Sequence, residues 1–231
     1  MPLFYFDSTY FILVVPAILF SLWAQGRVKS TYAKYSQVRS MRGVSGHDAV
    51  QSILRENNLT DVQIGRVAGS LTDHYDPRTS VINLSETVYD NTSVAAIGVA
   101  AHETGHALQY AENYLPAKLR MALVPVTQFG ANLSMPLILI GFFMQRQPLI
   151  NFGLILYSLM FLFQLVTLPV EFNASSRALR AIEAGGILSE TELTGTKKVL
   201  DAAALTYVAA MLTSLMSLLR LLILFGGRRR D

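Results

Sequence analysis

The sequence predicts a mostly α-helical membrane protein, with about four transmembrane helices and a small α+β part. Three observations support this fold class. Of the 231 residues, 52% are hydrophobic and only 15% are charged, whereas soluble domains carry roughly 25% charged residues. The shortfall comes from four long and nearly uncharged stretches, and a helix needs about 20 such residues to cross a bilayer. Between the first two stretches lie polar segments with both helical and strand-like patterns.

The composition also limits the chemistry of the chain. There is no cysteine, so disulfides and thiolate metal sites are excluded. The net charge of +3 is too small to indicate nucleic-acid binding. We therefore expect no nucleic-acid partner.

The four apolar stretches are the expected membrane helices. They cover residues 3–24, 121–144, 149–170 and 202–225. The first and the last each contain one charge, at Asp7 and Arg220 respectively. The first lacks a basic leading region and an A-x-A-like cleavage site, so we interpret it as a retained anchor rather than a signal peptide. Only residues 145–148 separate the second and third stretches, which predicts a transmembrane hairpin.

Basic residues predict the orientation in the membrane. Five of them follow the first stretch before any acidic residue: Arg27, Lys29, Lys34, Arg39 and Arg42. By the positive-inside rule this flank lies in the cytoplasm. If the last helix spans, the arginines at 228–230 end outside, against the same rule. Whether the last helix fully crosses the membrane is therefore left open.

The polar region after the first stretch shows a mixed pattern. Ser45 and Asp48 have the spacing of a capping box and precede a helical pattern. "DVQIGRVAG" predicts a strand, and "SLTDHYDPRTSVINLS" predicts two strands around an Asp-Pro turn. The Asn-Thr-Ser run at 91–93 can cap a helix through "VAAIGVAAHETGHALQY". Further along, "EFNASSRALRAIEAGG" predicts a helix that ends at Gly185.

The helix after residue 93 contains an H-E-x-x-H motif. Helix positions four apart face the same way, with about 5–6 Å between their Cβ atoms, so His102 and His106 can bind one metal ion together. Neutral imidazole suits zinc, and a catalytic zinc takes three protein ligands plus water. Glu103 is placed to take a proton from that water, as in metallopeptidases. Gly105, without a side chain, permits close approach of another element.

The third zinc ligand should come from elsewhere in the chain. Glu171 ends the third apolar stretch abruptly, in "TLPVEFNAS". A charge at such a boundary is either an interfacial residue or a functional one. Two membrane crossings separate Glu171 from His106, so both are expected on the same face of the membrane. On spacing alone, the alternatives are Glu183, Glu190, Glu192 and His74.

These motifs resemble those of the YugP-like membrane zinc metallopeptidases, the neutral zinc metallopeptidase 2 family. The matching stretches are "GSLTDHYDPRT", "INLSE", "AAIGVAAHETGHALQY", "TLPVEFNASSRAL" and "KKVLDAAALTYVAA", which extend over nearly the whole chain. The resemblance implies a zincin with His102 and His106 as zinc ligands. It also implies Glu103 as the general base and Glu171 as the third ligand.

A more distant resemblance is to the HtpX-like and CAAX-prenyl endopeptidases. These proteins have an aspartate four residues after the ligand glutamate, where it orients a ligand. Here that position is Ser175, a weaker orienting group than a carboxylate. We expect Asn173 to share the task.

Five segments follow from this interpretation. They are an anchor at 1–25, a zincin-like part with the H-E-x-x-H helix at 26–120, a transmembrane hairpin at 121–170, a third-ligand helix and linker at 171–201, and a C-terminal membrane helix with a basic tail at 202–231.

A zinc hydrolase also needs a donor for the oxyanion of the tetrahedral intermediate. The candidates are His74, Tyr75, Arg177 and Tyr207. We choose His74 as the second catalytic residue, because zincins bind substrate along an edge strand and His74 lies in a predicted strand beside a turn. The alternative is a surface strand whose polar residues face out. Arg177 could instead pair with an acid such as Glu183.

The sequence thus predicts a membrane-embedded, zinc-dependent endopeptidase that cleaves membrane-associated proteins or peptides. The cofactor is Zn²⁺, the partners are a protein or peptide substrate and the lipid bilayer, and the oligomeric state is left open. We expect an integral protein of a bacterial cell membrane, with its active site on the cytoplasmic face. The alternative is a non-catalytic metal-binding membrane scaffold or chaperone-like protein, which would have no use for a base at Glu103.

Overall fold

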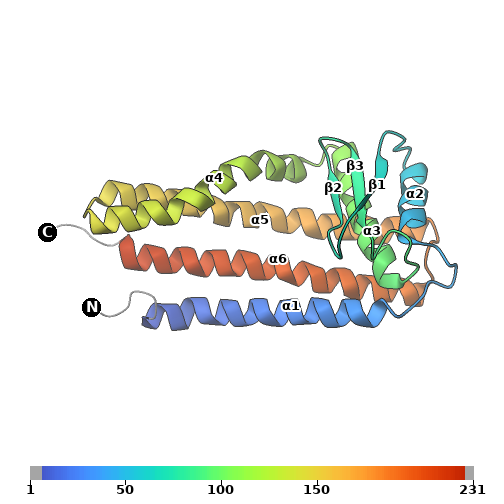
Figure 1. Ribbon diagram of the computed structural model, residues 1–231, viewed down its shortest axis with the longest axis horizontal. Helices are drawn as coiled ribbons and strands as arrows, with labels where there is room; N and C mark the ends of the chain where they lie inside the picture. Colours follow the sequence, from blue (N-terminus) through green and yellow to red (C-terminus); the bar gives the residue numbers. More distant parts are fainter. Residues whose placement is uncertain (1–6, 227–231) are drawn as a thin grey trace. The chain divides into compact units, whose positions relative to one another are not determined.

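The structure is a computed structural model that describes residues 7–226, and within this range it has six α-helices and three strands (Figure 1). The elements are a π-helical turn η1 (Tyr10–Val14), α1 (Val15–Tyr35), α2 (Gly46–Glu56), β1 (Gln63–Val67), β2 (His74–Asp76), β3 (Val81–Ser85), α3 (Val94–Ala111), α4 (Leu115–Phe143), α5 (Gln147–Ala184) and α6 (Glu190–Phe225). Residues 3–6 of the first expected span and the basic tail at 228–230 lie outside the described residues.

Within residues 7–226, four helical segments are long and apolar enough to cross a membrane, by length and composition: Tyr10–Tyr35, α4, α5 and α6. The predicted fold class, mostly α with a small α+β part, is confirmed. With 38 and 36 residues, α5 and α6 are far longer than the roughly 20 residues that a crossing needs. The chain divides into two compact units, and α1, α4, α5 and α6 each contribute residues to both.

The first unit, here called the membrane unit, comprises Met1–Gln25, Leu119–Pro169 and Thr206–Asp231. Its buried apolar core is formed by Ile138, Ile150, Leu154 and Leu221. The helices α4 and α5 approach closely, since a Cβ added at Gly153 would lie 2.8 Å from the backbone oxygen of Ser134. Small residues that let backbones come together are typical of helix packing in membranes.

The two charges in the apolar stretches of the membrane unit pair with each other. Arg220 Nη2 lies 3.1 Å from Asp7 Oδ1. Ser21 and Thr213 add a hydroxyl contact of 3.1 Å between α1 and α6. Charges within membrane helices are expensive unless they are paired, so this pair explains how both are tolerated there.

The second unit, here called the α+β unit, comprises Gly26–Lys118 and Val170–Leu205. Its three strands form a sheet in the order β1-β3-β2, with β1 parallel and β2 antiparallel to β3. Ile82 and Leu84 of the central strand are fully buried. The predicted turn at Asp76 and Pro77 joins β2 to β3, and β2 is an edge strand.

Helix α3 lies between two apolar cores of the α+β unit. The first core contains α2, the sheet and α3 residues, including Val50, Ile82 and Ala100. The second contains α2, α3, α5 and α6 residues, including Ile97, Ile182 and Leu200. Contact on both sides explains why α3 is rich in alanine and glycine, since larger side chains would not fit between the two layers.

Local capping fixes where the helices of this unit begin. Ser45 and Asp48 form the predicted capping box at the start of α2. The Ser93 hydroxyl accepts a hydrogen bond from the amide of Ala96 at 3.2 Å and so caps α3. The register of α3, and with it the direction of its histidines, is therefore set before the chain reaches the motif.

Candidate metal centre

A glycine sets the distance between the two helices that build the site. A Cβ at Gly105 would collide with the backbone oxygen of Ala174 and would lie 3.2 Å from its Cα. The backbones of α3 and α5 therefore approach each other directly between His102 and His106. Glu171 precedes Ala174 by about one helical turn, so this approach places its carboxylate beside both imidazoles.

The three side chains converge on one point through defined atoms. Glu171 Oε2 lies 3.2 Å from His102 Nε2 and 3.6 Å from His106 Nε2. Among the described residues, these three form the group of potential ligand atoms within 4.8 Å of one another. The Glu171 side chain is only 2% exposed, whereas those of His102 and His106 are 14% and 12% exposed. A buried carboxylate thus meets two imidazoles that solvent still reaches.

This donor set fits zinc. Zinc in proteins binds imidazole nitrogen and carboxylate oxygen at about 2.0–2.2 Å in tetrahedral geometry, which separates neighbouring donor atoms by roughly 3.3 Å. The two carboxylate-to-imidazole distances of 3.2 and 3.6 Å match that separation. Three protein ligands also leave a fourth position for water, as in catalytic rather than structural zinc sites.

The outer nitrogen of each histidine has its own partner. His102 Nδ1 lies 3.1 Å from Ser175 Oγ, and His106 Nδ1 lies 3.0 Å from Gln109 Oε1. Ser175, which stands where the related peptidases have an orienting aspartate, thus contacts a histidine. Because Gln109 Oε1 can only accept, His106 Nδ1 donates, which leaves the Nε2 lone pair facing Glu171. Such contacts fix the ring orientation that a metal requires.

The orientation of the Gln109 amide is itself determined by α5. Gln109 is fully buried, and its Nε2 donates to the Val170 backbone oxygen at 2.7 Å and to Asn173 Oδ1 at 2.9 Å. Sequence reasoning missed Gln109. The only available signal was its spacing three residues after His106 on the same helix, which makes the two neighbours.

Arg177 extends this network away from the histidines. Its Nε donates to Asn173 Oδ1 at 2.7 Å, and its Nη1 lies 2.5 Å from Glu112 Oε1. The guanidinium of Arg177 lowers the pKa of the Glu112 carboxyl below its ordinary value. The partner of Arg177 is therefore Glu112, where the sequence suggested an acid such as Glu183. Asn173 accepts a hydrogen bond from Gln109, which in turn contacts His106. Asn173 was expected to help orient a ligand, and the ligand that it acts on, through Gln109, is His106.

The carboxylate of Glu103 is held by the edge strand. The backbone N–H of Tyr75 donates to Glu103 Oε2 at 3.0 Å. Tyr75 is paired with Ile82 across the sheet, and its amide points outward from the free edge of β2 toward α3. Burial raises the pKa of the Tyr75 phenol above its ordinary value.

Three other residues that the sequence offered as a third ligand or an oxyanion donor lie outside the group of His102, His106 and Glu171. The ring nitrogens of the exposed His74 contact the Thr72 backbone oxygen at 2.9 Å and the Asn83 amide at 3.3 Å. Glu192 accepts from the backbone amides of Ser189 and Met41 at the start of α6. Tyr207 belongs to α6 within the membrane unit. The catalytic role assigned to His74 stays a prediction.

Two imidazoles and a buried carboxylate, next to a glutamate held by an edge strand, are the parts of a zinc peptidase site. The chain belongs to the family described as "Putative neutral zinc metallopeptidase", whose model matches residues 10–226. The chain is 47% identical over 222 residues to the "Putative membrane protease YugP" of Bacillus subtilis (strain 168), a match that covers 96% of this chain and 99% of that protein. No solved structure matches the chain. The family resemblance drawn from the sequence is confirmed.

Proposed function

We propose that the chain is a zinc-dependent endopeptidase that hydrolyses peptide bonds of proteins or peptides at the membrane surface. The observation that carries this proposal is the convergence of Glu171 on His102 and His106. Zn²⁺ bound there would lower the pKa of a water molecule toward 7 and polarise the scissile carbonyl. His102 Nε2, His106 Nε2 and Glu171 Oε2 would hold the ion.

Glu103 is the general base in this proposal. Its Oε2 is held by the Tyr75 amide, so Oε1 is the oxygen that takes the proton from water and later gives it to the leaving amine. The hydrogen bond from Tyr75 keeps the carboxylate in one orientation before substrate arrives. Preorganisation of this kind reduces the reorganisation that the reaction itself would need.

The substrate chain is proposed to lie in extended form along the free edge of β2. An edge strand can pair with an extended peptide through the backbone groups that are not already bonded, which on β2 exclude the Tyr75 amide. The amide of Tyr75 on that edge contacts the base directly, so a peptide paired with β2 would pass next to Glu103. His74 and the Tyr75 phenol are the candidate donors for the oxyanion. The cytoplasmic position of the site is part of the proposal, based on the basic residues that follow the first span.

Replacement of the base tests the enzymatic proposal against a metal-binding scaffold. The full-length protein, purified in detergent and loaded with zinc, is incubated with an unfolded protein such as casein. Glu103→Gln should keep zinc, because Glu103 is not a ligand, and should lose cleavage by a factor of at least about 10². The matched control Glu86→Gln, at an exposed glutamate, should cleave like wild type. Equal cleavage by Glu103→Gln and wild type would contradict the enzyme and favour the scaffold.

A further inference from the structure

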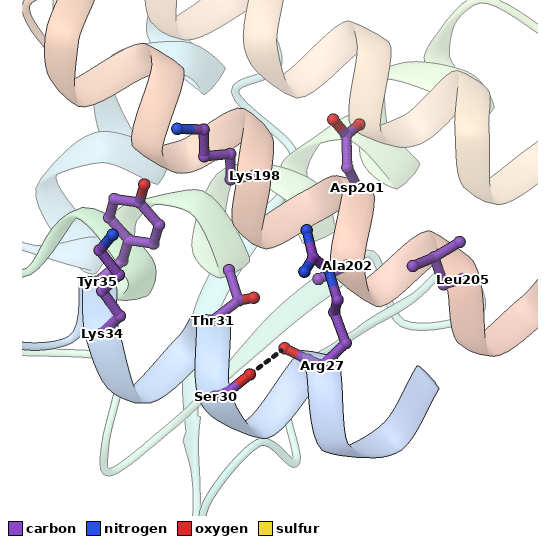
Figure 2. Close-up of a pocket in the computed structure, with 9 residues that line it drawn as sticks. All are labelled: Arg27, Ser30, Thr31, Lys34, Tyr35, Lys198, Asp201, Ala202 and Leu205. Carbon is purple, nitrogen blue, oxygen red and sulfur yellow. Dashed lines mark hydrogen bonds between the residues drawn. The ribbon is translucent and has the colours of Figure 1, made fainter. Parts of the chain in front are cut away.

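A groove of about 540 Å³ lies between α1 and α6 in the α+β unit (Figure 2). None of the residues that line it belongs to the metal centre described above. Arg27 and Lys34 of α1 and Lys198 of α6 supply its positive charge, and Leu205 supplies an apolar wall. The groove therefore combines several cations with an apolar surface.

The charged side chains that line the groove are mostly positive. They include three cations and one acid, Asp201. Asp201 Oδ2 lies 2.7 Å from Lys197 Nζ, so its charge is already compensated by a lysine outside the lining. Figure 2 shows Arg27 reaching from α1 toward α6, whereas the side chains of Lys198 and Asp201 both extend from α6 away from α1. An anion in the groove would meet Arg27 and Lys34 of α1, and Lys198 can reach it by a change of side-chain rotamer, without strong opposition from Asp201.

The groove lies where both helices change from apolar to polar sequence. On α1, residues 8–26 carry no charge and Arg27 is the first basic residue after them. On α6, the uncharged run begins at Ala202, directly after Asp201. Trp23 precedes Arg27 by one helical turn and is 53% exposed, and tryptophan is enriched at the level of lipid headgroups. The change from apolar to charged sequence thus falls at the groove on both α1 and α6, which run in opposite directions, and it marks the expected membrane boundary there.

We propose that this groove binds the phosphate headgroup of an anionic phospholipid. Basic pockets between membrane helices are suited to anionic headgroups, and Arg27, Lys34 and Lys198 would form charge-assisted hydrogen bonds to phosphate oxygens. The acyl chain would continue along Leu205 toward the uncharged part of α6. Free phosphate offers the same oxygens, but it has no apolar part for this wall.

Trp23 is the only tryptophan of the chain, and it lies one helical turn before Arg27 on α1, so its fluorescence reports on lipids beside this part of α1. The full-length protein is placed in phosphatidylcholine vesicles that contain a minor fraction of phosphatidylglycerol. Bromine atoms, which quench tryptophan fluorescence, are carried either by the phosphatidylglycerol or by an equal fraction of the phosphatidylcholine. The proposal expects the anionic lipid to associate at least about fivefold more strongly than the zwitterionic lipid. Equal quenching by the two brominated lipids would overturn it, without need of any variant.

Two sets of variants test whether the preference for anionic lipid arises at the groove. The triple change Arg27→Gln, Lys34→Gln and Lys198→Gln should reduce the preference to near unity. A control triple, Lys29→Gln, Arg55→Gln and Arg78→Gln, removes the same charge at exposed positions outside the groove and should keep the preference. An equal loss in both triples would show general attraction to the bilayer and would overturn the site.

Free phosphate is separated from lipid by competition. Inorganic phosphate, added at constant ionic strength to the same vesicles, should leave the quenching difference unchanged if the groove prefers a lipid. Loss of the difference would assign the groove to free phosphate and overturn the lipid proposal.

Discussion

The orientation of His106 depends on one neutral side chain, that of Gln109. The Nδ1 of His106 donates to Gln109, and Gln109 is held in turn by Val170 and Asn173 of α5. The amide can accept from His106 only in the orientation that these two acceptors impose on its Nε2. Gln109 therefore determines which nitrogen of His106 faces Glu171, although it touches no reacting atom.

Replacement of Gln109 by leucine should weaken zinc binding while the fold is retained. Loss of the acceptor frees the His106 ring, and changes of this kind typically reduce metal affinity by about 10–100-fold. Zinc affinity is measured by competition with a chelator, next to the control Gln51→Leu at an exposed position. In the metal-free protein, ¹⁵N spectra should show His106 with its proton on Nδ1 in wild type and a mixture of tautomers in Gln109→Leu. Unchanged affinity and an unchanged tautomer would contradict the role of Gln109.

At the scale of residues, the sequence predicted the parts of the site that depend on local spacing. The pairing of His102 and His106 follows from helical periodicity. The hairpin predicts only that Glu171 returns to the same face, and the choice of Glu171 among the other candidates came from the family resemblance. Gln109 and the Tyr75 amide could not be predicted in this way. Their partners are 61 to 64 and 28 residues away in the chain, and a backbone amide leaves no signal in the sequence.

At the scale of elements, the close approach of α3 and α5 at Gly105 brings together the residues of the candidate metal centre. Gly105→Ala would place a methyl group against the Ala174 backbone oxygen, which cannot move without shifting Glu171. Overpacking of this kind destabilises by about 1–3 kcal/mol. We therefore expect a lower midpoint of thermal unfolding in detergent, together with reduced zinc content.

A matched control separates this contact from the general effect of replacing glycine in a helix. Gly26 lies in α1 and has no heavy atom within 4 Å of an added Cβ. Gly26→Ala should be neutral or stabilising by up to about 1 kcal/mol and should keep its zinc. A Gly105→Ala protein as stable and as zinc-rich as Gly26→Ala would contradict the packing account.

The helix starts and strands were predicted correctly where nearby capping or turn residues determine them. The capping residues Ser45 and Ser93 begin helices as expected, and the strand patterns around the Asp-Pro turn formed β2 and β3. The continuity of α5 was harder to predict, because the helix passes through Pro169 and the charge of Glu171. Both features commonly mark helix or span boundaries, and here tertiary packing of the following turns continues the helix instead.

At the scale of the whole molecule, orientation in the membrane is a testable part of the proposal. The chain contains no cysteine, so single cysteines can be introduced and labelled in intact bacterial cells with a membrane-impermeant maleimide. Thr60→Cys, in the α+β unit, should be labelled only after permeabilisation. Arg146→Cys, in the turn between α4 and α5, should be labelled in intact cells. The reverse pattern would place the site on the outer face and contradict the positive-inside interpretation.

The central claim is that α5 supplies the third ligand to the two histidines of α3, and metal analysis tests it most directly. Wild type, Glu171→Ala and the control Glu183→Ala are purified under the same conditions, and zinc is measured per chain. Wild type and Glu183→Ala should contain stoichiometric zinc, and Glu171→Ala should have lost most of it. Full zinc occupancy in Glu171→Ala would contradict the account and move the search for the third ligand to the other acidic residues or His74.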